Sequence, residues 1–283
     1  MRPYAGGVAR QNFYADALLY DILHAEGTSH DARVVTRLVR AWGPKVTRGT
    51  RLTLLEPACG SGRYLLALAK HGHRATGFDL SRGMIRYAKQ QTVQGGHTER
   101  VRAFVGRMEE FTLPKAWRAH GAFNLINSIR HLESDSAMLA HLRSVRRALL
   151  PAGVYIVGLG LCAYGLETES EDVWHGSRVV RGVRTRVTQT VQYLPAPQAG
   201  ARTTRKALRA ERVISHMTVT AGHGRPAQER HIDSVYTLRS YNLAQWRSLI
   251  SRAGWRIVAT TDQDGLPMVP SEPGYFLWVL RPI

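Results

Sequence analysis

The stretch that decides the fold is "LLEPACGSGRYLLALAKHGHRATGFDLS", residues 54–81. It opens within an apolar run, residues 52–55, and then breaks into a small turn that contains Gly60 and Gly62. After the turn, apolar side chains recur at the spacing of one helix face. They are Leu65, Leu66, Leu68 and Ala69. The stretch therefore predicts a strand, a tight loop and a helix.

The glycine turn is a candidate ligand site. At the carboxyl end of a first parallel strand, a Gly-x-Gly turn lets the backbone approach a ligand, and the amides that open the next helix carry partial positive charge. Asp79 ends the second expected strand, where such folds place a carboxylate that binds both hydroxyls of a ribose. Each feature also has a purely structural interpretation, because glycines shape turns and Asp79 with Ser81 can cap a helix. Together, at this spacing, they favour a ligand that contains adenosine.

Strand and helix signals alternate over about a hundred residues from Leu52 onward. This alternation predicts an α/β fold with a mostly parallel sheet and crossover helices. The expected strands are 52–56, 74–78, 101–105, 123–127 and 153–159, with helices at 63–70, 82–91 and 136–150 and two amphipathic helices, 14–24 and 32–42, ahead of the sheet.

The pattern changes after Leu161. Residues 178–194, "RVVRGVRTRVTQTVQYL", alternate apolar and polar side chains, which predicts one half-exposed antiparallel strand. A turn, "PAPQAGA" (195–201), and two similar strands, 208–221 and 229–241, follow, and the α/β pattern resumes with a helix at 243–253 and strands at 255–261 and 275–283. We therefore expect a core made of residues 1–160 and 241–283, interrupted by an antiparallel insert at 161–240.

The composition narrows the functional classes. A chain of 283 residues with 44% hydrophobic content can bury a full core. The formal net charge is +18, but every segment is basic and none is a polybasic arm, so dispersed surface charge is favoured over a nucleic-acid footprint. Cys59 and Cys162 are too few for a disulfide framework or a metal cluster, which indicates a reduced, cytoplasmic setting. No signal peptide or membrane span is expected.

The loop sequence separates the adenosine ligands. A dinucleotide site would need a glycine at the position of Leu65, and a Walker loop would need Gly-Lys-Ser/Thr after Gly62, where this chain has Arg63. What remains is "EPACGSGR", residues 56–63, which resembles the acid-x-x-x-Gly-x-Gly motif of the Rossmann-like S-adenosylmethionine-dependent methyltransferases.

The resemblance extends over residues 14–159 and 241–283. "GFDLSRGMIRYAK" (77–89) is similar to the family's second motif, and "GRMEEFTL" (106–113) to the segment after its third strand. "FNLINSIRHLESDSAMLAHLRSVRRALLPAGVYIVGL" (123–159) is similar to the fourth strand, the following helix and the fifth strand. The resemblance implies a seven-stranded sheet with helices on both faces, and an insert at the place where this family commonly elaborates a substrate lid.

The same resemblance implies roles for individual residues. Glu56 and the loop 60–62 would hold the methionine end of S-adenosylmethionine, Asp79 the ribose, and Leu80 and Met108 the two adenine faces. Asn127 would lie under the donor at the end of the fourth strand. The expected donor-binding set is Tyr20, Glu56, Ala58, Cys59, Gly60, Ser61, Gly62, Asp79, Leu80, Met84, Arg107, Met108 and Asn127.

One position departs from the family pattern. Many relatives carry an acid where this chain has Arg107, and that acid accepts a hydrogen bond from the adenine amino group. A guanidinium cannot accept one. We expect backbone groups of Met108 and Glu109 to take over this contact.

Methyl transfer from a sulfonium releases a neutral thioether, so positioning and desolvation supply much of the catalysis. A base is needed only if the acceptor arrives protonated, and His131, after the fourth expected strand, is the first candidate. A structural hydrogen bond is its alternative role. Tyr14 and Tyr20 are alternative shapers of the methyl channel. Four aromatic residues of the insert and the next helix could line an acceptor pocket or belong to the core, and two insert histidines are expected to be surface residues: Trp174, Tyr193, Tyr236, Trp246, His175 and His231.

The acceptor is least defined by the sequence. "INSIR" lacks the Asn/Asp-Pro-Pro-aromatic element of many nucleic-acid and protein-glutamine methylases, and neither cysteine stands where a cytosine-C5 nucleophile would. These absences favour a small molecule methylated at N or O. RNA, tracked by the insert's Arg181, Arg184, Arg186 and Arg205, and a non-catalytic donor-binding protein are the alternatives. The insert could also be a homodimer surface.

Overall fold

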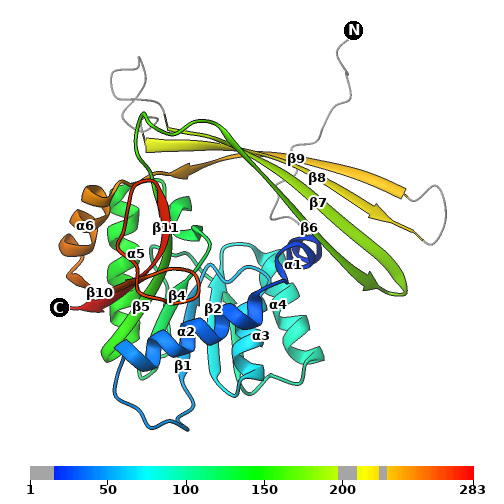
Figure 1. Cartoon of the computed structure of the whole chain (residues 1–283). Coiled ribbons are helices and arrows are strands. Elements are labelled where there is room, and N and C mark those ends of the chain that lie inside the picture. Colours follow the sequence, from blue (N-terminus) through cyan, green and yellow to red (C-terminus); the bar gives the residue numbers. More distant parts are fainter. Residues whose placement is uncertain (1–15, 197–208, 223–227) are drawn as a thin grey trace.

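A seven-stranded sheet forms the centre of the protein (Figure 1). The computed structural model describes residues 16–196, 209–222 and 228–283. The strand order is β10-β11-β5-β4-β1-β2-β3, and β11 alone runs antiparallel to its neighbours in this sheet. The strands are β1 (Thr53–Pro57), β2 (Arg74–Asp79), β3 (Val101–Val105), β4 (Ala119–Asn124), β5 (Leu149–Leu161), β10 (Trp255–Thr261) and β11 (Gly274–Pro282).

Helices cover both faces of this sheet. One hydrophobic cluster joins α2, α3 and α4 to one face, and a second joins α5 and α6 to the other. Each fully buried aliphatic side chain contributes about 1.5–3 kcal/mol, so these two layers dominate the stability of the core. The helices are α1 (Ala17–His24), α2 (Thr28–Trp42), α3 (Arg63–Lys70), α4 (Arg82–Gln94), α5 (Asp135–Ala148) and α6 (Leu243–Arg252), with a short 3₁₀ helix, η2 (Ser128–His131).

Polar caps fix where three helices begin. Ser81 accepts a hydrogen bond from the amide of Met84 at the start of α4, and Ser134 accepts one from Ala137 at the start of α5. Asn242 and Gln245 form a capping box at α6. These bonds satisfy amides that the first helical turn leaves without a partner.

The order in which strands are added to the sheet reverses between β1 and β4, although these two strands are parallel. Strands β1, β2 and β3 follow one another toward one edge, and β4 and β5 then build outward from β1 in the other direction. Asn124, the last residue of β4, joins these two halves because its Nδ2 donates to the carbonyl of Pro57 at 2.7 Å. In open α/β sheets, ligands bind beyond the carboxyl ends of the strands at such a reversal.

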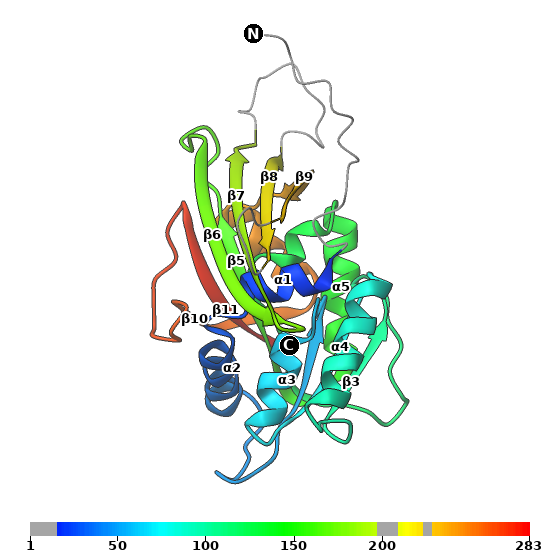
Figure 2. The ribbon, with the colours of Figure 1, turned by 90° about the vertical axis from the view of Figure 1, so that its right-hand side faces the viewer.

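A second, four-stranded antiparallel sheet lies over this edge of the core, and we call it the roof sheet (Figures 1 and 2). Its strands are β6 (Ser170–Val180), β7 (Val183–Leu194), β8 (Ala210–Ala221) and β9 (Gln228–Arg239). The prediction of a single strand over 178–194 is wrong. Arg181 and Gly182 adopt left-handed conformations (φ 49° and 82°) and form the two-residue turn between β6 and β7.

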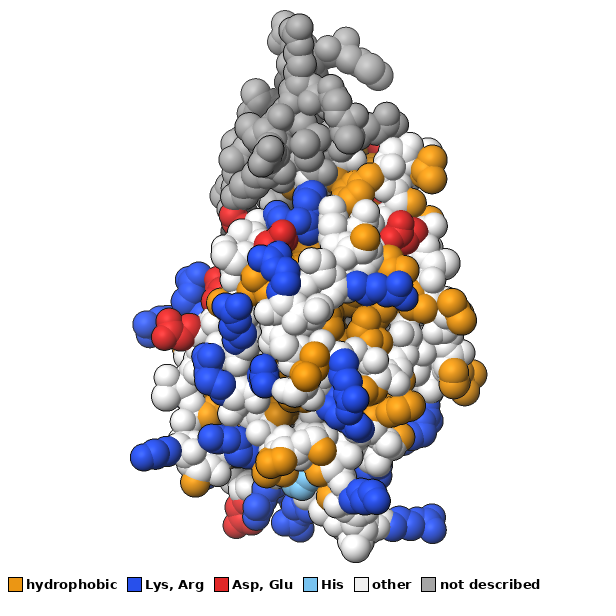
Figure 3. Space-filling model, turned by 90° about the vertical axis from the view of Figure 1, so that its left-hand side faces the viewer, with side chains coloured by type: hydrophobic (Ala, Val, Ile, Leu, Met, Phe, Trp, Pro, Cys, Tyr) orange, Lys and Arg blue, Asp and Glu red, His pale blue; other side chains and the backbone are white. Residues whose placement is uncertain are grey.

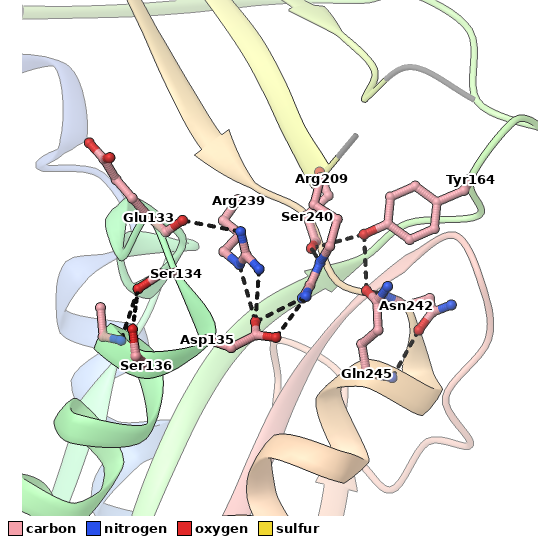
Figure 4. A network of polar contacts seen from close by, with 11 residues as sticks. Glu133, Ser134, Asp135, Ser136, Tyr164, Arg209, Arg239, Ser240, Asn242 and Gln245 are labelled. Carbon is pink, nitrogen blue, oxygen red and sulfur yellow. Dashed lines mark hydrogen bonds and ion pairs between the residues drawn. The ribbon is translucent and has the colours of Figure 1, made fainter. Parts of the chain in front are cut away.

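The roof sheet is attached to the core at the base of β8 and β9 (Figure 4). Both oxygens of Asp135, the first residue of α5, accept from Arg209 at 3.0 Å, and Arg239 donates to the same carboxylate at 2.9 Å. Tyr164 contacts Ser240 and Gln245 at 3.0 Å each. Burial alone would raise the pKa of Asp135, but the two arginines outweigh it and lower that pKa. We call Asp135, Arg209 and Arg239 the base anchor.

Most other predicted boundaries differ by a few residues. The fourth strand ends at Asn124 rather than Asn127. The fifth strand, β5, begins at Leu149 rather than residue 153, and it includes a left-handed residue, Ala152 (φ 63°). The second helix begins at Thr28 rather than residue 32. Tyr14, Arg205 and most of the turn 195–201 lie outside the described residues.

Basic side chains are numerous on the face shown in Figure 3, where neutral and hydrophobic ones separate many of them. Arg143, Arg146, Arg147 and Arg252 line a groove of about 560 Å³ at the ends of α5 and α6. This groove lies where β5 and β10 begin, at the opposite edge of the sheet from the glycine turn. No helix in the described part of the chain is long and apolar enough to cross a membrane.

Candidate functional site

The loop between β1 and α3, residues 57–62, holds three residues in the left-handed region, and we call it the donor loop. They are Ala58 (φ 54°), Gly60 (φ 51°) and Gly62 (φ 76°). A Cβ added at Gly62 would lie 2.8 Å from Cβ of Ala88, so α3 and α4 approach too closely there for a side chain. Strained backbone of this kind concentrates at ligand sites because the surrounding structure must hold it in place.

Asp79 ties the donor loop to the end of β2. Its Oδ2 accepts from the amide of Gly60 at 2.9 Å, and its Oδ1 accepts from the amide of Ser81 at 2.8 Å. Burial raises the pKa of Asp79, and these amides oppose that shift. This carboxylate therefore organises the loop and the start of α4, and it still has lone pairs that could accept from a ribose, the role that stays a prediction.

Glu56 lies beneath the donor loop with a buried oxygen, Oε2, that has no hydrogen-bond partner among the described residues. Oδ1 of Asn124, at the neighbouring strand end, is also buried and has no partner in the described part of the chain. Burial raises the pKa of Glu56 well above its usual value, and the charge of the buried Arg63 opposes that shift. Two open acceptors beside a guanidinium fit a zwitterion, whose ammonium donates and whose carboxylate accepts, as in the methionine part of S-adenosylmethionine.

The other end of the site has an apolar surface. Leu80 follows Asp79 with 64% of its surface exposed, whereas Met84 is buried at 1% and Met108 is partly buried against the core. An exposed leucine beside a candidate ribose carboxylate is placed to cover the face of a planar base. Cys59, by contrast, is buried and packs against Gly77 of β2.

Arg107 is largely exposed and pairs with an acid two residues along the chain. Its guanidinium binds the carboxylate of Glu109 at 2.9 Å, and 63% of the side chain is exposed. The carbonyl of Met108 accepts from His141 at 3.0 Å, and the carbonyl of Glu109 accepts from Ser144 at 2.9 Å. Both carbonyls thus already accept one bond from α5, and each keeps a second lone pair that can accept from an amino group.

Asn127 lies in a tight turn after β4 rather than in the strand. Ile126 and Asn127 are both left-handed (φ 56° and 59°), and Oδ1 of Asn127 accepts from the amide of Gly160 at 2.7 Å. A Cβ at Gly160 would lie 3.4 Å from that oxygen. The turn is therefore held against β5, beside the strand ends that border the donor loop.

Helix α1 covers the donor loop from above. The ring of Tyr20 lies 3.4 Å from the position of a Cβ at Gly60, so the loop glycine allows this contact. His24, one turn later, packs between Tyr20 (4.5 Å between ring centroids) and Trp174 of the roof sheet (5.6 Å). Burial, followed by the charge of Arg63, lowers the pKa of His24 to about 4. His24 was not among the predicted site residues.

His131 ends η2 beneath the roof sheet. Its ring lies 5.7 Å from the ring of Tyr236 on β9, and Tyr193 on β7 packs in the same cluster. Burial, followed by the charge of Arg130, lowers the pKa of His131 below its usual value. The imidazole is therefore neutral at pH 7 and able to accept a proton.

Several candidates lie elsewhere. Trp246 is fully buried in the core against Trp278, and His175 and His231 are exposed on the roof sheet. Arg184 and Arg186 alternate with the buried Thr185 and Val187, so they point to the outer face of the roof sheet, away from α1 and the donor loop.

Three buried polar residues at the site were missed by the sequence interpretation: Asp21, Arg63 and Asn124. Arg63 immediately follows the glycine turn, and Asn124 is the last residue of β4, so their positions beside the site were visible in the sequence. No sequence signal marks Asp21 as a site residue, because an acid in a short amphipathic helix ordinarily faces solvent. Among the described residues, no group of His, Cys, Asp and Glu side chains could hold a metal ion.

Comparison with known proteins gives matches over the core and over the whole chain. Residues 54–153 match the family model of a methyltransferase domain. The dTDP-3-amino-3,6-dideoxy-alpha-D-glucopyranose N,N-dimethyltransferase of Streptomyces fradiae is 30% identical over 145 residues, and the match spans 50% of this chain and about half (51%) of that protein. The dTDP-3-amino-3,4,6-trideoxy-alpha-D-glucopyranose N,N-dimethyltransferase of Streptomyces venezuelae is 24% identical, over 92% of this chain and 96% of that protein.

A solved structure matches over nearly the full length. It is CalS10 from Micromonospora echinaspora, an amino pentose methyltransferase with bound S-adenosylmethionine. The TM-score is 0.64 at 18% identity, and the match covers 97% of this chain and 100% of that one. This likeness establishes the fold.

Proposed function

Because the chain belongs to the S-adenosylmethionine-dependent methyltransferases of Rossmann-like fold, we propose that it transfers a methyl group to an amino nitrogen of a small molecule, an amino sugar linked to a nucleotide. The observation that carries the donor half is the unpartnered, buried Oε2 of Glu56 beside the donor loop. The acceptor half rests on the two dimethyltransferases to which the chain is similar, one of them over 92% of its length.

Different residues of the donor site bind different parts of S-adenosylmethionine. Glu56 and Asn124 accept from its ammonium group, and the positive charge of the buried Arg63 attracts its carboxylate. Asp79 binds the ribose, and Leu80 and the partly buried Met108 pack against the adenine. When bound, S-adenosylmethionine supplies an electrophilic methyl group, and the protein's own part is to align that methyl and exclude water.

The acceptor approaches from the roof side. Tyr20 of α1 lies on the donor loop, His24 packs on Tyr20 and Trp174 of β6 packs on His24, so we place the acceptor path between α1, η2 and the roof sheet. An amine attacks only in its neutral form, and His131, whose pKa is lowered by burial, is the group we assign to take its proton.

Turnover with a panel of acceptors tests the proposal. The purified protein is incubated with S-adenosylmethionine and a dTDP-linked 3-amino sugar, the free amino sugar or a short RNA, and methylated products are identified by mass spectrometry. We expect N-methylation of the nucleotide-linked sugar, slower reaction of the free sugar and none of the RNA. Methylation of RNA alone, or of no acceptor despite donor binding, would contradict the proposal.

The setting of the reaction is also a proposal. Cys59 and Cys162 are both buried free thiols, which fits a reducing cytoplasm. The outer strands of the roof sheet, β6 and β9, are the surfaces we assign to a homodimer. Sedimentation of the natural protein tests this assignment, and a monomer at micromolar concentration would contradict it.

A further inference from the structure

Asp21 is a buried carboxylate on which three separate parts of the fold converge. Its Oδ1 accepts from the hydroxyl of Ser61 in the donor loop at 2.8 Å. Its Oδ2 accepts from Arg178 of β6 at 2.7 Å and from the hydroxyl of Tyr87 of α4 at 3.0 Å. Arg178 also reaches the backbone carbonyl of Asp21 at 3.4 Å. One side chain therefore joins the donor loop, the core and the roof sheet.

The position of α1 explains how the roof sheet can act on the donor loop through Asp21. The helix lies between the donor loop and the roof sheet (Figure 2). On its lower side, Tyr20 rests on Gly60. On its upper side, the backbone of β6 lies so close that a Cβ at Gly176 would be 2.4 Å from the carbonyl oxygen of Ile22. A shift of β6 therefore shifts α1, and with it Asp21.

Ser61 is where that shift reaches the donor site. It stands between Gly60 and Gly62, and its side chain is buried at 1%. Glycines on both sides leave the backbone of this segment with little intrinsic preference, so its orientation depends on outside contacts. Beside the backbone bond from Gly62 to Cys59 at 2.9 Å, two bonds to side chains hold it: the bond from Ser61 to Asp21 and the bond from Gly60 to Asp79.

We propose that Asp21 and Arg178 are positioning residues for the donor: Arg178 of the roof sheet fixes the carboxylate of Asp21, and Asp21 fixes Ser61 and the amides of the donor loop. This inference rests on the proposed function, because it assumes that the donor loop binds S-adenosylmethionine. An acceptor that presses the roof sheet onto α1 then tightens donor binding, and by reciprocity a bound donor tightens acceptor binding.

The rival explanation is that the pair only fastens the roof sheet to the core. The base anchor provides the control, because Arg239 binds Asp135 and thus fastens the same sheet without touching α1 or the donor loop. Arg178→Met and Arg239→Met each remove one arginine that pairs with an aspartate of the core. Only the first acts on Asp21.

The experiment measures the dissociation constant of S-adenosylhomocysteine by calorimetry, without acceptor. The proteins are the natural chain, Arg178→Met, Arg178→Lys, Ser61→Ala, the Arg178→Met/Ser61→Ala double variant and Arg239→Met. We expect Arg178→Met to weaken binding by about 2- to 30-fold, the range found for residues that modulate coupling without contacting the ligand. Arg178→Lys should recover part of the loss, and Arg239→Met should bind like the natural chain.

The double variant gives the decisive comparison. If Arg178 acts through Ser61, the dissociation constant of the double variant is no larger than that of the single variant that binds S-adenosylhomocysteine more weakly. Two independent, multiplying losses would overturn the inference, as would equal losses in Arg178→Met and Arg239→Met. If Arg178→Met does not fold, Ser61→Ala and Arg178→Lys take its place in the comparison. An unchanged dissociation constant in both of these variants overturns the inference. No binding by the natural chain would remove the proposed function itself, whereas normal binding that ignores Arg178 removes only this inference.

Discussion

Replacing Glu56 by Gln separates the functional role of this residue from its structural role. The buried Oε2 has no partner among the described residues, and burial raises the pKa of the carboxyl well above its usual value. A donor ammonium would supply the missing partner and favour the charged carboxylate. A hydrogen bond to a charged group contributes about 1.5–3 kcal/mol, so Glu56→Gln should weaken donor binding by about 10- to 150-fold.

The same substitution should stabilise the donor-free protein. A carboxyl whose pKa is raised in the folded state supports the fold below its ordinary pKa of about 4.3, and this support is lost as the pH rises through the raised value. Gln carries no charge to bury, so above that pH the Glu56→Gln protein should melt higher than the natural one. A gain of about 1 kcal/mol, at the low end for an unsatisfied buried group, raises Tm by about 2–4 °C.

The assay combines calorimetry with S-adenosylhomocysteine and thermal melting, both between pH 5 and pH 9. In the natural protein, donor affinity should rise with pH up to the raised pKa of Glu56 and then level off, because binding releases the proton of the carboxyl. Glu56→Gln should abolish this dependence. A variant that melts lower and still binds the donor with natural affinity would refute the assignment of Glu56 to the ammonium group.

Four further substitutions, one of them a control, test other parts of the site and the fold. Gly62→Ala places a side chain 2.8 Å from Cβ of Ala88 in a left-handed conformation that itself costs about 1–2 kcal/mol, so it should lower Tm and donor affinity together. Gly182→Ala, equally left-handed but with no described residue within 4 Å of the added Cβ, should lower Tm without changing affinity; equal effects on affinity would contradict the close packing at Gly62. For His131, the lowered pKa predicts that kcat/KM rises with pH around a midpoint below 6.5, and that His131→Gln removes this limb of the profile; an unchanged profile would leave the base elsewhere. Ser134→Ala removes the cap of α5 and should cost about 1 kcal/mol in thermal melts, with donor affinity unchanged; a loss of affinity would mean that α5 is coupled to the donor site.

The sequence predicted the core well where local signals agree with the tertiary fold. The helix 63–70 and the strands 101–105 and 255–261 match α3, β3 and β10, because each combines an apolar periodicity with clear turn residues at its ends. The glycine turn and Asp79 lie together as expected, joined by the bond from Gly60.

The failures have physical causes in particular residues. Arg181 and Gly182 lie within a continuous alternation of apolar and polar residues. Because both residues adopt the left-handed conformation, the chain folds back there and forms a hairpin instead of one strand. Asn127 reads as the end of a strand, yet it is held in a turn by Gly160, a contact between segments that no local pattern encodes. Asp21 acquires its role from Ser61, Tyr87 and Arg178, which lie 40, 66 and 157 residues away in the chain.

The measurement that tests the central claim most directly is a titration of S-adenosylmethionine into the natural protein and into Asp79→Ala. Asp264→Ala is the matched control, because its carboxylate is exposed and binds His30 at 2.8 Å, apart from the donor loop. The account predicts saturable binding at one site that Asp264→Ala retains and Asp79→Ala weakens by at least about tenfold, since a charge-assisted bond contributes about 1.5 kcal/mol or more. No binding at millimolar donor, or equal binding by Asp79→Ala, would contradict it.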